Sequence, residues 1–356
     1  MSRPKFPKTS VSFRDELKSR ISDYFKQKGK SEHGNFKLYL KAGILVTALL
    51  ATYIHLIFFT PITAIAIVEC ALMGCLIAAI GFNVMHDGAH GSFSRYKWVN
   101  SAASNFANFL GASQLMWKQK HNVIHHTYTN IHGVDDDIEA RPLLRLCDEQ
   151  DYYKIHRYQH VYFWAAYSLL YIWWIFVTDY KKYFTGRIGG VELPKFSLKE
   201  HLAFWFYKLA HAFLFVALPI MMVGAIPWLI GFLTMGLVAG FVLSIVFQLA
   251  HTVEHTHFPM PDVATNKMED EWTIHQIKTT ANFATKNKIV SWLVGGLNFQ
   301  VEHHLFPKIS HVHYPAISQI IKRVCQEYGI TYIEYPRVRL AVASHLAFLR
   351  QMGKAR

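Results

Sequence analysis

The chain has 356 residues, of which 52% are apolar and 15% aromatic, while only 17% are charged. So little charge excludes a disordered or fibrous chain and is unusual for a soluble globular protein, so a membrane protein is the first interpretation. The net charge of +13 suits nucleic acid, an anionic lipid surface or a phosphate-bearing substrate, and charge alone does not choose among them. The 4 cysteines include no C-x-x-C pair, which excludes a disulfide scaffold and an iron–sulfur centre.

The chain begins with a basic, polar arm over residues 1–40 that lacks the apolar core of a signal peptide. Beyond it, Glu69 is the only formally charged residue between Lys41 and His86, and Pro61 divides this apolar stretch in two. A second divided stretch follows the middle of the chain, so we expect four transmembrane helices in two hairpins. The spans are expected at about 42–60, 62–85, 205–223 and 226–250.

A fifth apolar stretch, about 161–177, is long enough to cross a membrane but is rich in Trp and Tyr. This composition favours a segment that lies in the membrane interface.

Basic residues fall almost wholly outside the two hairpins, so the positive-inside rule places both termini and the central loop in the cytoplasm. The expected fold is an all-α membrane protein whose cytoplasmic helical cap holds the histidine-rich segments. We expect one membrane domain over residues 41–340 and a C-terminal tail over 341–356. The protein is expected to be an integral, multi-pass membrane protein.

The histidines are clustered. Four windows with 23 residues in total hold ten of the 21 histidines, and such clustering is typical of a metal site because neutral imidazole is a common ligand of transition metals. The windows are 86–90, 121–126, 251–257 and 300–304.

The spacing within the windows indicates how the rings are grouped. His86 and His90 are four residues apart, as are His121 and His125, so each pair shares one face of a helix. His126 points about 100° away from His125, which predicts either two metal ions or one ligand on each of two faces. All windows must meet on one side of the bilayer, and this requirement also argues against a spanning 161–177 segment.

These residues resemble the integral-membrane fatty acid desaturases and the related hydroxylases. Three histidine boxes match that family in order and spacing, and the run from Phe299 to Pro307 is a particularly close match to the third box. The resemblance covers about residues 40 to 340. The matching residues are His86, His90, His121, His125, His126, Gln300, His303 and His304.

The resemblance implies two non-haem iron ions that use O2 and two electrons to place a double bond in an acyl chain. In the family a further histidine ahead of the third box completes the ligand set; His251 is the best match and His255 the second choice. Gln300 resembles the front-end subset, which desaturates between the carboxyl end and an existing double bond, and it serves as a weak ligand or an outer donor. The implied activity is that of a linoleoyl-CoA Δ6-like desaturase, without catalytic residues other than the metal ligands.

Several polar residues near the boxes are candidates to orient the imidazoles by accepting their second N–H. Asp87 and Glu302 lie within the first and third boxes, and both also suit simple solvation at a helix end. Asn130 and the aspartate run 135–137 resemble a further family segment, although a solvated turn would look the same.

The chain contains no G-x-G-x-x-G fingerprint, no P-loop and no His-Pro-Gly-Gly haem motif of cytochrome b5. A separate electron donor of ferredoxin or cytochrome b5 type, with its reductase, is therefore expected. The other expected partners are an acyl-CoA or acyl-lipid substrate and membrane lipids, with no nucleic acid. A bacterial inner membrane is favoured over endoplasmic reticulum, with the active site facing the cytoplasm.

Two alternatives remain open at the level of the sequence. The same boxes suit a lipid hydroxylase or ketolase, because desaturation and oxygen insertion diverge only late in the reaction. A membrane metal carrier would also gather histidines, but it would place its ligands near the middle of its spans rather than beyond the helix ends.

Overall fold

The computed structural model describes residues 3–7 and 13–354 of the chain. Within these residues almost all regular structure is helical, and strands occur only in two short pairs. The antiparallel pair is β1 (Arg187–Ile188) with β2 (Val191–Glu192), and the parallel pair is β3 (Asn282–Phe283) with β4 (Glu334–Tyr335).

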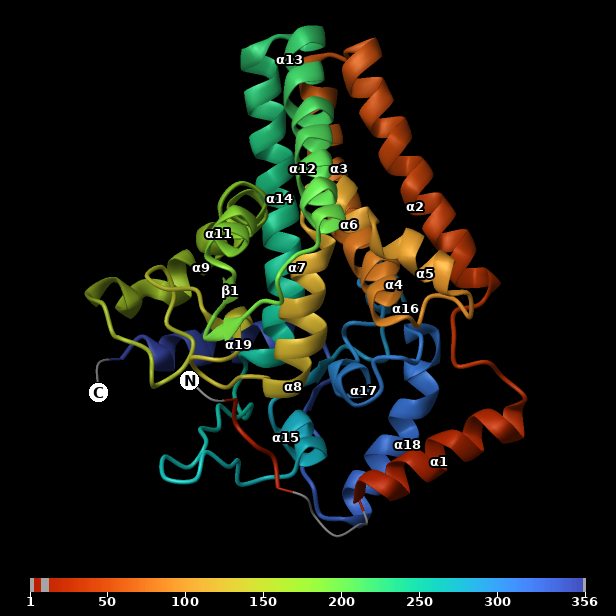
Figure 1. Ribbon diagram of the computed structural model, residues 1–356, viewed down its shortest axis with the longest axis vertical. Coiled ribbons are helices and arrows are strands. Elements are labelled where there is room, and N and C mark those ends of the chain that lie inside the picture. Colours follow the sequence, from red (N-terminus) through yellow and green to blue (C-terminus); the bar gives the residue numbers. More distant parts are fainter. Residues whose placement is uncertain (1–2, 8–12, 355–356) are drawn as a thin grey trace.

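Four helical segments of the described chain are long and apolar enough to cross a membrane, and together they form a bundle (Figure 1). The predicted class, an all-helical membrane protein with four spans, is confirmed. The segments are Phe36–Phe59 (α2, Phe36–Ile54, and η1, His55–Phe59), Thr63–His90 (α3, Thr63–Ile80, η2, Gly81–Met85, and α4, His86–His90), Leu198–Val223 (α12, Leu198–Ala212, η7, Phe213–Ala217, and α13, Leu218–Val223) and Ala225–His251 (α14).

The ends of these helices follow from local chemistry. The first span begins at Phe36, earlier than the apolar run, because the side chain of Asn35 accepts a hydrogen bond from the Leu38 amide. The third begins at Leu198 rather than near Trp205, because Ser197 and Glu200 form a capping box. The second continues through His90, where Gly91 ends it in a left-handed conformation.

Small residues allow the helices to pack closely. A Cβ atom on Gly74 of α3 would lie 2.4 Å from the carbonyl oxygen of Met235 in α14, so only glycine permits this approach. On another side of α14, a Cβ atom on Gly240 would lie 2.2 Å from the carbonyl oxygen of Ser168. α14 is therefore held closely against both α3 and the segment that contains Ser168.

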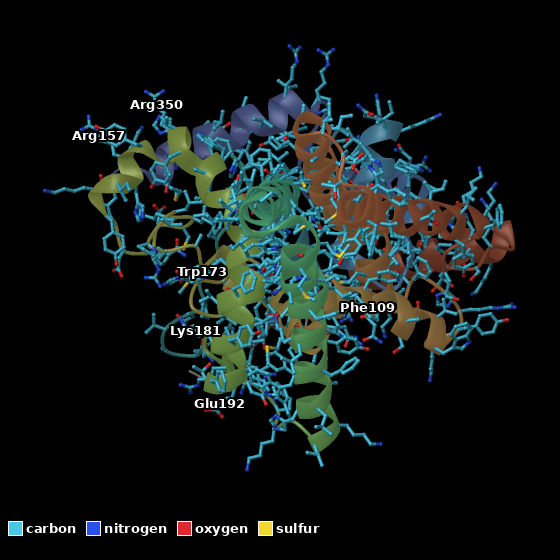
Figure 2. The ribbon with its side chains drawn as sticks, turned by 90° about the horizontal axis from the view of Figure 1, so that it is seen from above. Phe109, Arg157, Trp173, Lys181, Glu192 and Arg350 are labelled. Atoms are coloured by element: carbon cyan, nitrogen blue, oxygen red, sulfur yellow. The ribbon has the colours of Figure 1, made fainter. Side chains whose placement is uncertain are left out.

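That segment covers the stretch expected at 161–177. It consists of two helical parts, Lys154–Ser168 and Leu170–Thr185, that are bent by 55°. Seen from above, it crosses the view past the labelled Arg157, Trp173 and Lys181, whereas α14 is seen nearly end-on (Figure 2). The segment therefore runs across the side of the bundle. Its elements are η5 (Lys154–Tyr158), α9 (Gln159–Ser168), α10 (Leu170–Trp173), η6 (Trp174–Thr178) and α11 (Asp179–Thr185).

The remaining elements gather at one end of the bundle, opposite the short connections between the paired spans (Figure 1). The apolar face of α1 packs on α18 through residues that include Leu17, Ile21 and Ile321. These elements are α1 (Phe13–Lys28), α5 (Lys97–Ser104), α6 (Phe106–Phe109), α7 (Gln114–Lys118), η3 (Gln119–His125), α8 (His126–Tyr128), η4 (Asp136–Ile138), α15 (Trp272–Lys278), α16 (Lys288–Leu293), α17 (Gln300–Leu305), η8 (His311–His313), α18 (Tyr314–Glu327) and α19 (Val338–Met352). α19 crosses the expected boundary between the membrane domain and the tail.

Candidate metal centre

Four parts of the chain bring the predicted histidines together. The first box is α4, at the end of the second span, and His251 is the last residue of α14. The second box lies in η3 and α8, and the third in α17. η3 is a π-helix, and a second π-helical turn, η2, directly precedes the first box. Such turns often occur at functional sites because they shift the direction of the side chains that follow.

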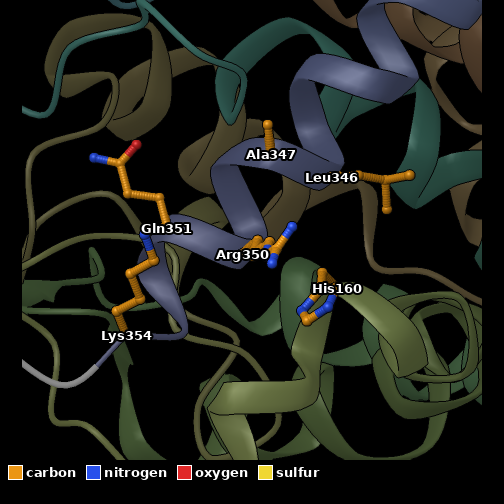
Figure 3. A pocket seen from close by; sticks show the side chains of 6 residues that line it. All are labelled: His160, Leu346, Ala347, Arg350, Gln351 and Lys354. Atoms are coloured by element: carbon orange, nitrogen blue, oxygen red, sulfur yellow. The ribbon is translucent and has the colours of Figure 1, made fainter.

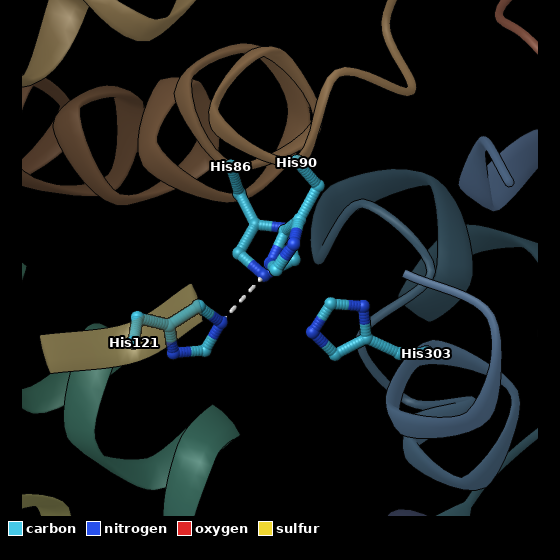
Figure 4. Close-up of side chains that lie close together, drawn as sticks. All are labelled: His86, His90, His121 and His303. Carbon is cyan, nitrogen blue, oxygen red and sulfur yellow. Dashed lines mark hydrogen bonds between the residues drawn. The ribbon is translucent and has the colours of Figure 1, made fainter. Parts of the chain in front are cut away.

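The first cluster contains His86, His90, His121 and His303, whose ligand atoms all lie within 4.8 Å of one another (Figure 4). The Nε2 atoms of His86 and His121 are 3.1 Å apart. The cluster contains no carboxylate, so its donors are all imidazole nitrogens.

The second cluster contains His125, His251 and His304, again within 4.8 Å of one another, and all three side chains are buried. His126 lies between the two clusters, because its ligand atom is within 4.8 Å of those of His303 and His304. Its ring centroid is 4.4 Å from that of His304.

The ligand atoms of His121, His125 and Asp137 also lie within 4.8 Å of one another. However, the Lys120 ammonium lies 2.6 Å from Asp137 Oδ1, so this carboxylate already pairs with a cation. We therefore do not count this group as a third ion site.

In the second cluster, the Nδ1 and Nε2 atoms of each imidazole have different surroundings. Nδ1 of His125 donates to Asp135 Oδ2 at 2.9 Å, Nδ1 of His251 to the Thr279 carbonyl at 3.2 Å, and Nδ1 of His304 to Gln276 Oε1 at 2.8 Å. Nε2 of each of these rings is buried and has no hydrogen-bond partner in the described part of the chain. Nε2 of His90 and Nε2 of His303 are also buried, and neither has a partner within residues 3–7 and 13–354. Buried polar atoms in native proteins are normally satisfied, so these converging nitrogens fit a set of metal ligands.

The protonation of the rings agrees with this interpretation. Burial, together with the neighbouring imidazoles, lowers the pKa of His121, His126, His303 and His304 well below the ordinary value. These rings are therefore neutral at pH 7, which is the form that binds a metal. His125 differs: burial lowers its pKa, but the nearby carboxylates of Asp135 and Asp137 outweigh this and raise it.

The residues around the second box hold it in place. The Asn130 amide N–H donates to Asp135 Oδ2 at 2.9 Å, and the Asn130 side chain donates to the carbonyl oxygens of His251 and His257 at 3.0 and 3.1 Å. Asn130 therefore contacts Asp135 through its backbone amide and the end of α14 through its side-chain carboxamide. It adopts a positive φ of 60°, which asparagine tolerates better than most residues.

The other predicted candidates have varied surroundings. Glu302 is buried and accepts hydrogen bonds from Asn282 Nδ2 at 2.7 Å and Tyr332 OH at 2.6 Å rather than from an imidazole. The Gln300 side chain is buried, and its Oε1 has no partner among the described residues. His255 has an exposed side chain and belongs to none of the clusters.

Asp87 is part of a buried polar chain beside the first box. Its Oδ2 accepts from His311 Nδ1 at 2.9 Å, while its Oδ1 lies 3.9 Å from His86 Nδ1, beyond hydrogen-bond distance. His311 Nε2 in turn lies 3.0 Å from the Lys41 ammonium. Asp87 therefore links the first box to α2 through His311.

Several residues at the site were not predicted from the sequence, and Gln276 and Tyr314 are two of them. Gln276 of α15 accepts from both His304 Nδ1 and Thr129 Oγ1, and Tyr314 OH lies 3.2 Å from His303 Nδ1. Neither residue stands at a diagnostic spacing from a box, so only the folded structure identifies them.

Comparison with known proteins agrees with this geometry. Residues 60–336 match the sequence profile of the family described as fatty acid desaturase. The chain belongs to the fatty acid desaturase family. It is accordingly an oxidoreductase that desaturates fatty acyl chains, and the resemblance seen in its three boxes is confirmed.

Several relatives match this desaturase over nearly its whole length. The sn-1 linoleoyl-lipid 6-desaturase of Synechocystis sp. is 37% identical over 96% of this chain and 96% of its own. The sn-1 linoleoyl-lipid 6-desaturase of Arthrospira platensis is 35% identical, covering 97% of this chain and 93% of its own. The acyl-lipid (8-3)-desaturase of Physcomitrium patens is 32% identical over 98% of this chain and 75% of its own.

Proposed function

We propose that this desaturase introduces a Δ6-like double bond into the linoleoyl chain of a membrane glycerolipid. The reaction would convert –CH2–CH2– to –CH=CH– while O2, two electrons and two protons become two molecules of water. The observation that supports it most directly is the convergence of eight imidazoles, seven of which have a buried nitrogen without a hydrogen-bond partner among the described residues. The choice of substrate rests on the two relatives named as sn-1 linoleoyl-lipid 6-desaturases. Gln300, which resembles the front-end subset, is consistent with that choice.

The two clusters would each hold one iron ion. His86, His90, His121 and His303 would hold the first, and His125, His251 and His304 the second, with His126 placed between them. When bound, the iron pair would activate O2 to an oxidant strong enough to remove hydrogen from an unactivated methylene group. The protein would fix the ligand rings through acceptors on their Nδ1 atoms, which are Asp135, Thr279 and Gln276.

In this proposal the protein lies in a bacterial inner membrane. The end of the bundle that carries the histidine boxes faces the cytoplasm, which is the side that the positive-inside rule predicts. The bent segment from η5 to α11 would lie in the interface rather than cross the bilayer. Electrons would come from a separate ferredoxin or cytochrome b5-type carrier with its reductase. Purified protein supplied with NADH and O2 alone should then form no product until both are added.

Lipid analysis of an expressing host tests the proposed function. With linoleoyl lipids present, gas chromatography with mass spectrometry should reveal a fatty acid lighter by two hydrogens, with the new double bond on the carboxyl side of the existing ones. The His304→Ala variant should not form it. A product heavier by one oxygen would indicate a hydroxylase instead, and a product formed equally by the variant would refute the assignment of the site.

A further inference from the structure

A second candidate site lies away from the histidine clusters, between the start of α9 and the last turns of α19. It is a surface pocket with a volume of about 700 Å3. The guanidinium of Arg350 and the ring of His160 face one another across it (Figure 3). The lining residues are His160, Leu346, Ala347, Arg350, Gln351 and Lys354.

The chemistry of this pocket suits an anion. Arg350 and Lys354 provide two positive charges, Gln351 provides an amide donor, and none of the described residues that line the pocket carries a carboxylate. Neither cation forms an ion pair with another described residue. The ring of His160 also lines the pocket, and its Nδ1 has no hydrogen-bond partner among the described residues.

The α19 wall of the pocket is held rigidly by buried side chains behind it. Arg145 Nη1 donates to the Met352 carbonyl at 2.9 Å, and Gln159 Nε2 donates to the Leu349 carbonyl at 2.8 Å. A Cβ atom on Gly353 would lie 2.4 Å from the His156 carbonyl oxygen, so the end of α19 lies directly against η5. The cationic side chains therefore project from a fixed backbone, which lowers the entropy lost when a ligand binds.

The surroundings of the pocket point to a lipid rather than a soluble anion. Directly after His160, the side chains of Val161 and Trp164 are 60% and 57% exposed. Exposed apolar and aromatic side chains on this segment suit the membrane interface, and Arg157 lies at the same edge of the molecule as Arg350 (Figure 2). A phosphate would bind in the basic pocket while the acyl chains lie along the apolar side of α9.

We infer that this pocket binds the phosphate group of an anionic glycerolipid headgroup. Basic pockets between helices at the membrane surface are a recurrent means of holding such headgroups. The inference concerns binding only and stands independently of the proposed desaturation, so either can fail without the other.

The test is lipid binding to the full-length protein, measured by native mass spectrometry during titration with phosphatidylglycerol and, separately, phosphatidylcholine. The variant Arg350→Gln/Lys354→Gln removes both charges from the pocket. The control Arg337→Gln/Arg339→Gln makes the same change at the other, exposed end of α19. His160→Gln tests the imidazole without changing the fixed charge.

We expect the protein to bind one phosphatidylglycerol more tightly than phosphatidylcholine. The pocket variant should lose this affinity by about tenfold or more, while the control retains it. His160→Gln should weaken binding by less. If the pocket variant and the control lost phosphatidylglycerol affinity equally, general surface charge would explain the binding, and the inference would be overturned.

Competition with inorganic phosphate distinguishes a site for a lipid phosphate from a site for a free phosphate ion. At an equal concentration inorganic phosphate should not displace the bound phosphatidylglycerol, because it cannot use the apolar side of α9. Displacement by inorganic phosphate would show a site for a free anion and would overturn the assignment to a lipid.

Discussion

At the scale of single residues, the site depends as much on the acceptors behind the histidines as on the histidines themselves. Each of three ligand candidates of the second cluster donates Nδ1 to a different kind of acceptor: a carboxylate, a backbone carbonyl and an amide. These bonds fix the tautomer and leave Nε2 free to bind. Removing an acceptor should therefore weaken metal binding without removing a ligand.

Asp135 provides the first such test. Its Oδ2 accepts from both His125 Nδ1 and the Asn130 amide, so Asp135→Asn replaces a charged acceptor with a neutral one at the centre of the network. We expect iron affinity to fall about 10–100-fold, as for other residues that orient metal ligands. The iron content of the purified protein measures this. Asp23→Asn, which makes the same change on the exposed side of α1, should retain the wild-type content, and unchanged iron in Asp135→Asn would contradict the assigned role.

Gln276 allows a comparison of two substitutions at one position. Gln276→Leu removes the acceptor of His304 Nδ1, whereas Gln276→Glu keeps an oxygen there. We expect Gln276→Leu to lower iron affinity about tenfold or more and Gln276→Glu to retain most of it. Iron titration of the apoprotein distinguishes them. If both variants lost iron equally, the hydrogen bond would not be what matters at this position.

Sequence reasoning found the imidazoles but not most of these acceptors, for a physical reason. Residues such as His86 and His90 repeat at helical spacing, so the pattern is visible in the chain. Gln276 lies 28 residues from His304 and 147 from Thr129, both of which it contacts, and its neighbours show no such pattern. The sequence also places Glu302 beside an imidazole ligand, yet its side chain points toward Asn282 and Tyr332.

At the scale of elements, α19 supports the end of α14 although it lies in the expected C-terminal tail. His345 of α19 is fully buried and donates Nδ1–H to the Thr252 carbonyl at 2.6 Å, while its Nε2 accepts from Tyr167 OH at 2.8 Å. Thr252 directly follows His251, so the ring of His345 fixes the end of α14 that carries His251 between α9 and α19.

This contact predicts a specific dependence of stability on pH. Burial lowers the pKa of His345 from 6.5 to about 4. Between these values the unfolded chain binds a proton that the folded protein does not, so stability falls as pH falls. His345→Gln should remove this contribution, which reaches about 3 kcal/mol near pH 4. Denaturant titration of the apoprotein in detergent from pH 7 to 4 measures it. The exposed His257→Gln variant is the control, and an unchanged acid slope in His345→Gln would contradict the prediction.

The position of the bent segment from η5 to α11 determines the membrane topology of the chain around it. If the segment lies in the interface, the chain on both of its sides is on the same face of the membrane. Cysteines introduced by Asp151→Cys and Lys195→Cys, with the native cysteines replaced, should react with an impermeant reagent from the same side. Ile62→Cys, in the connection between the first two spans, should react only from the opposite side. Labelling of Asp151→Cys and Lys195→Cys from opposite sides would show a fifth span.

The positions of the candidate spans could be predicted from hydropathy, whereas the starts of the first and third spans could not. Hydropathy locates α3 and α14 closely because their sequences are apolar throughout. The first turns of α12 are polar, and the capping box at Ser197 rather than hydropathy sets their start. The π-helical turns η2 and η3 beside the boxes were not predicted from the sequence.

At the scale of the whole molecule, the second and fourth spans bring their histidine-bearing ends together at one end of the bundle, where the remaining elements close around them (Figure 1). The histidines come from α4, the η3–α8 segment, α14 and α17, so no single element forms a site alone. Metal binding should therefore also stabilise the assembled fold, since the unfolded chain cannot present the same set of ligands.

Anomalous diffraction at the iron absorption edge, from crystals of the iron-loaded protein, tests this account most directly. Two separate peaks are predicted, one among His86, His90, His121 and His303 and the other among His125, His251 and His304. A single peak, or iron bound outside these imidazoles, would contradict the proposed two-iron centre.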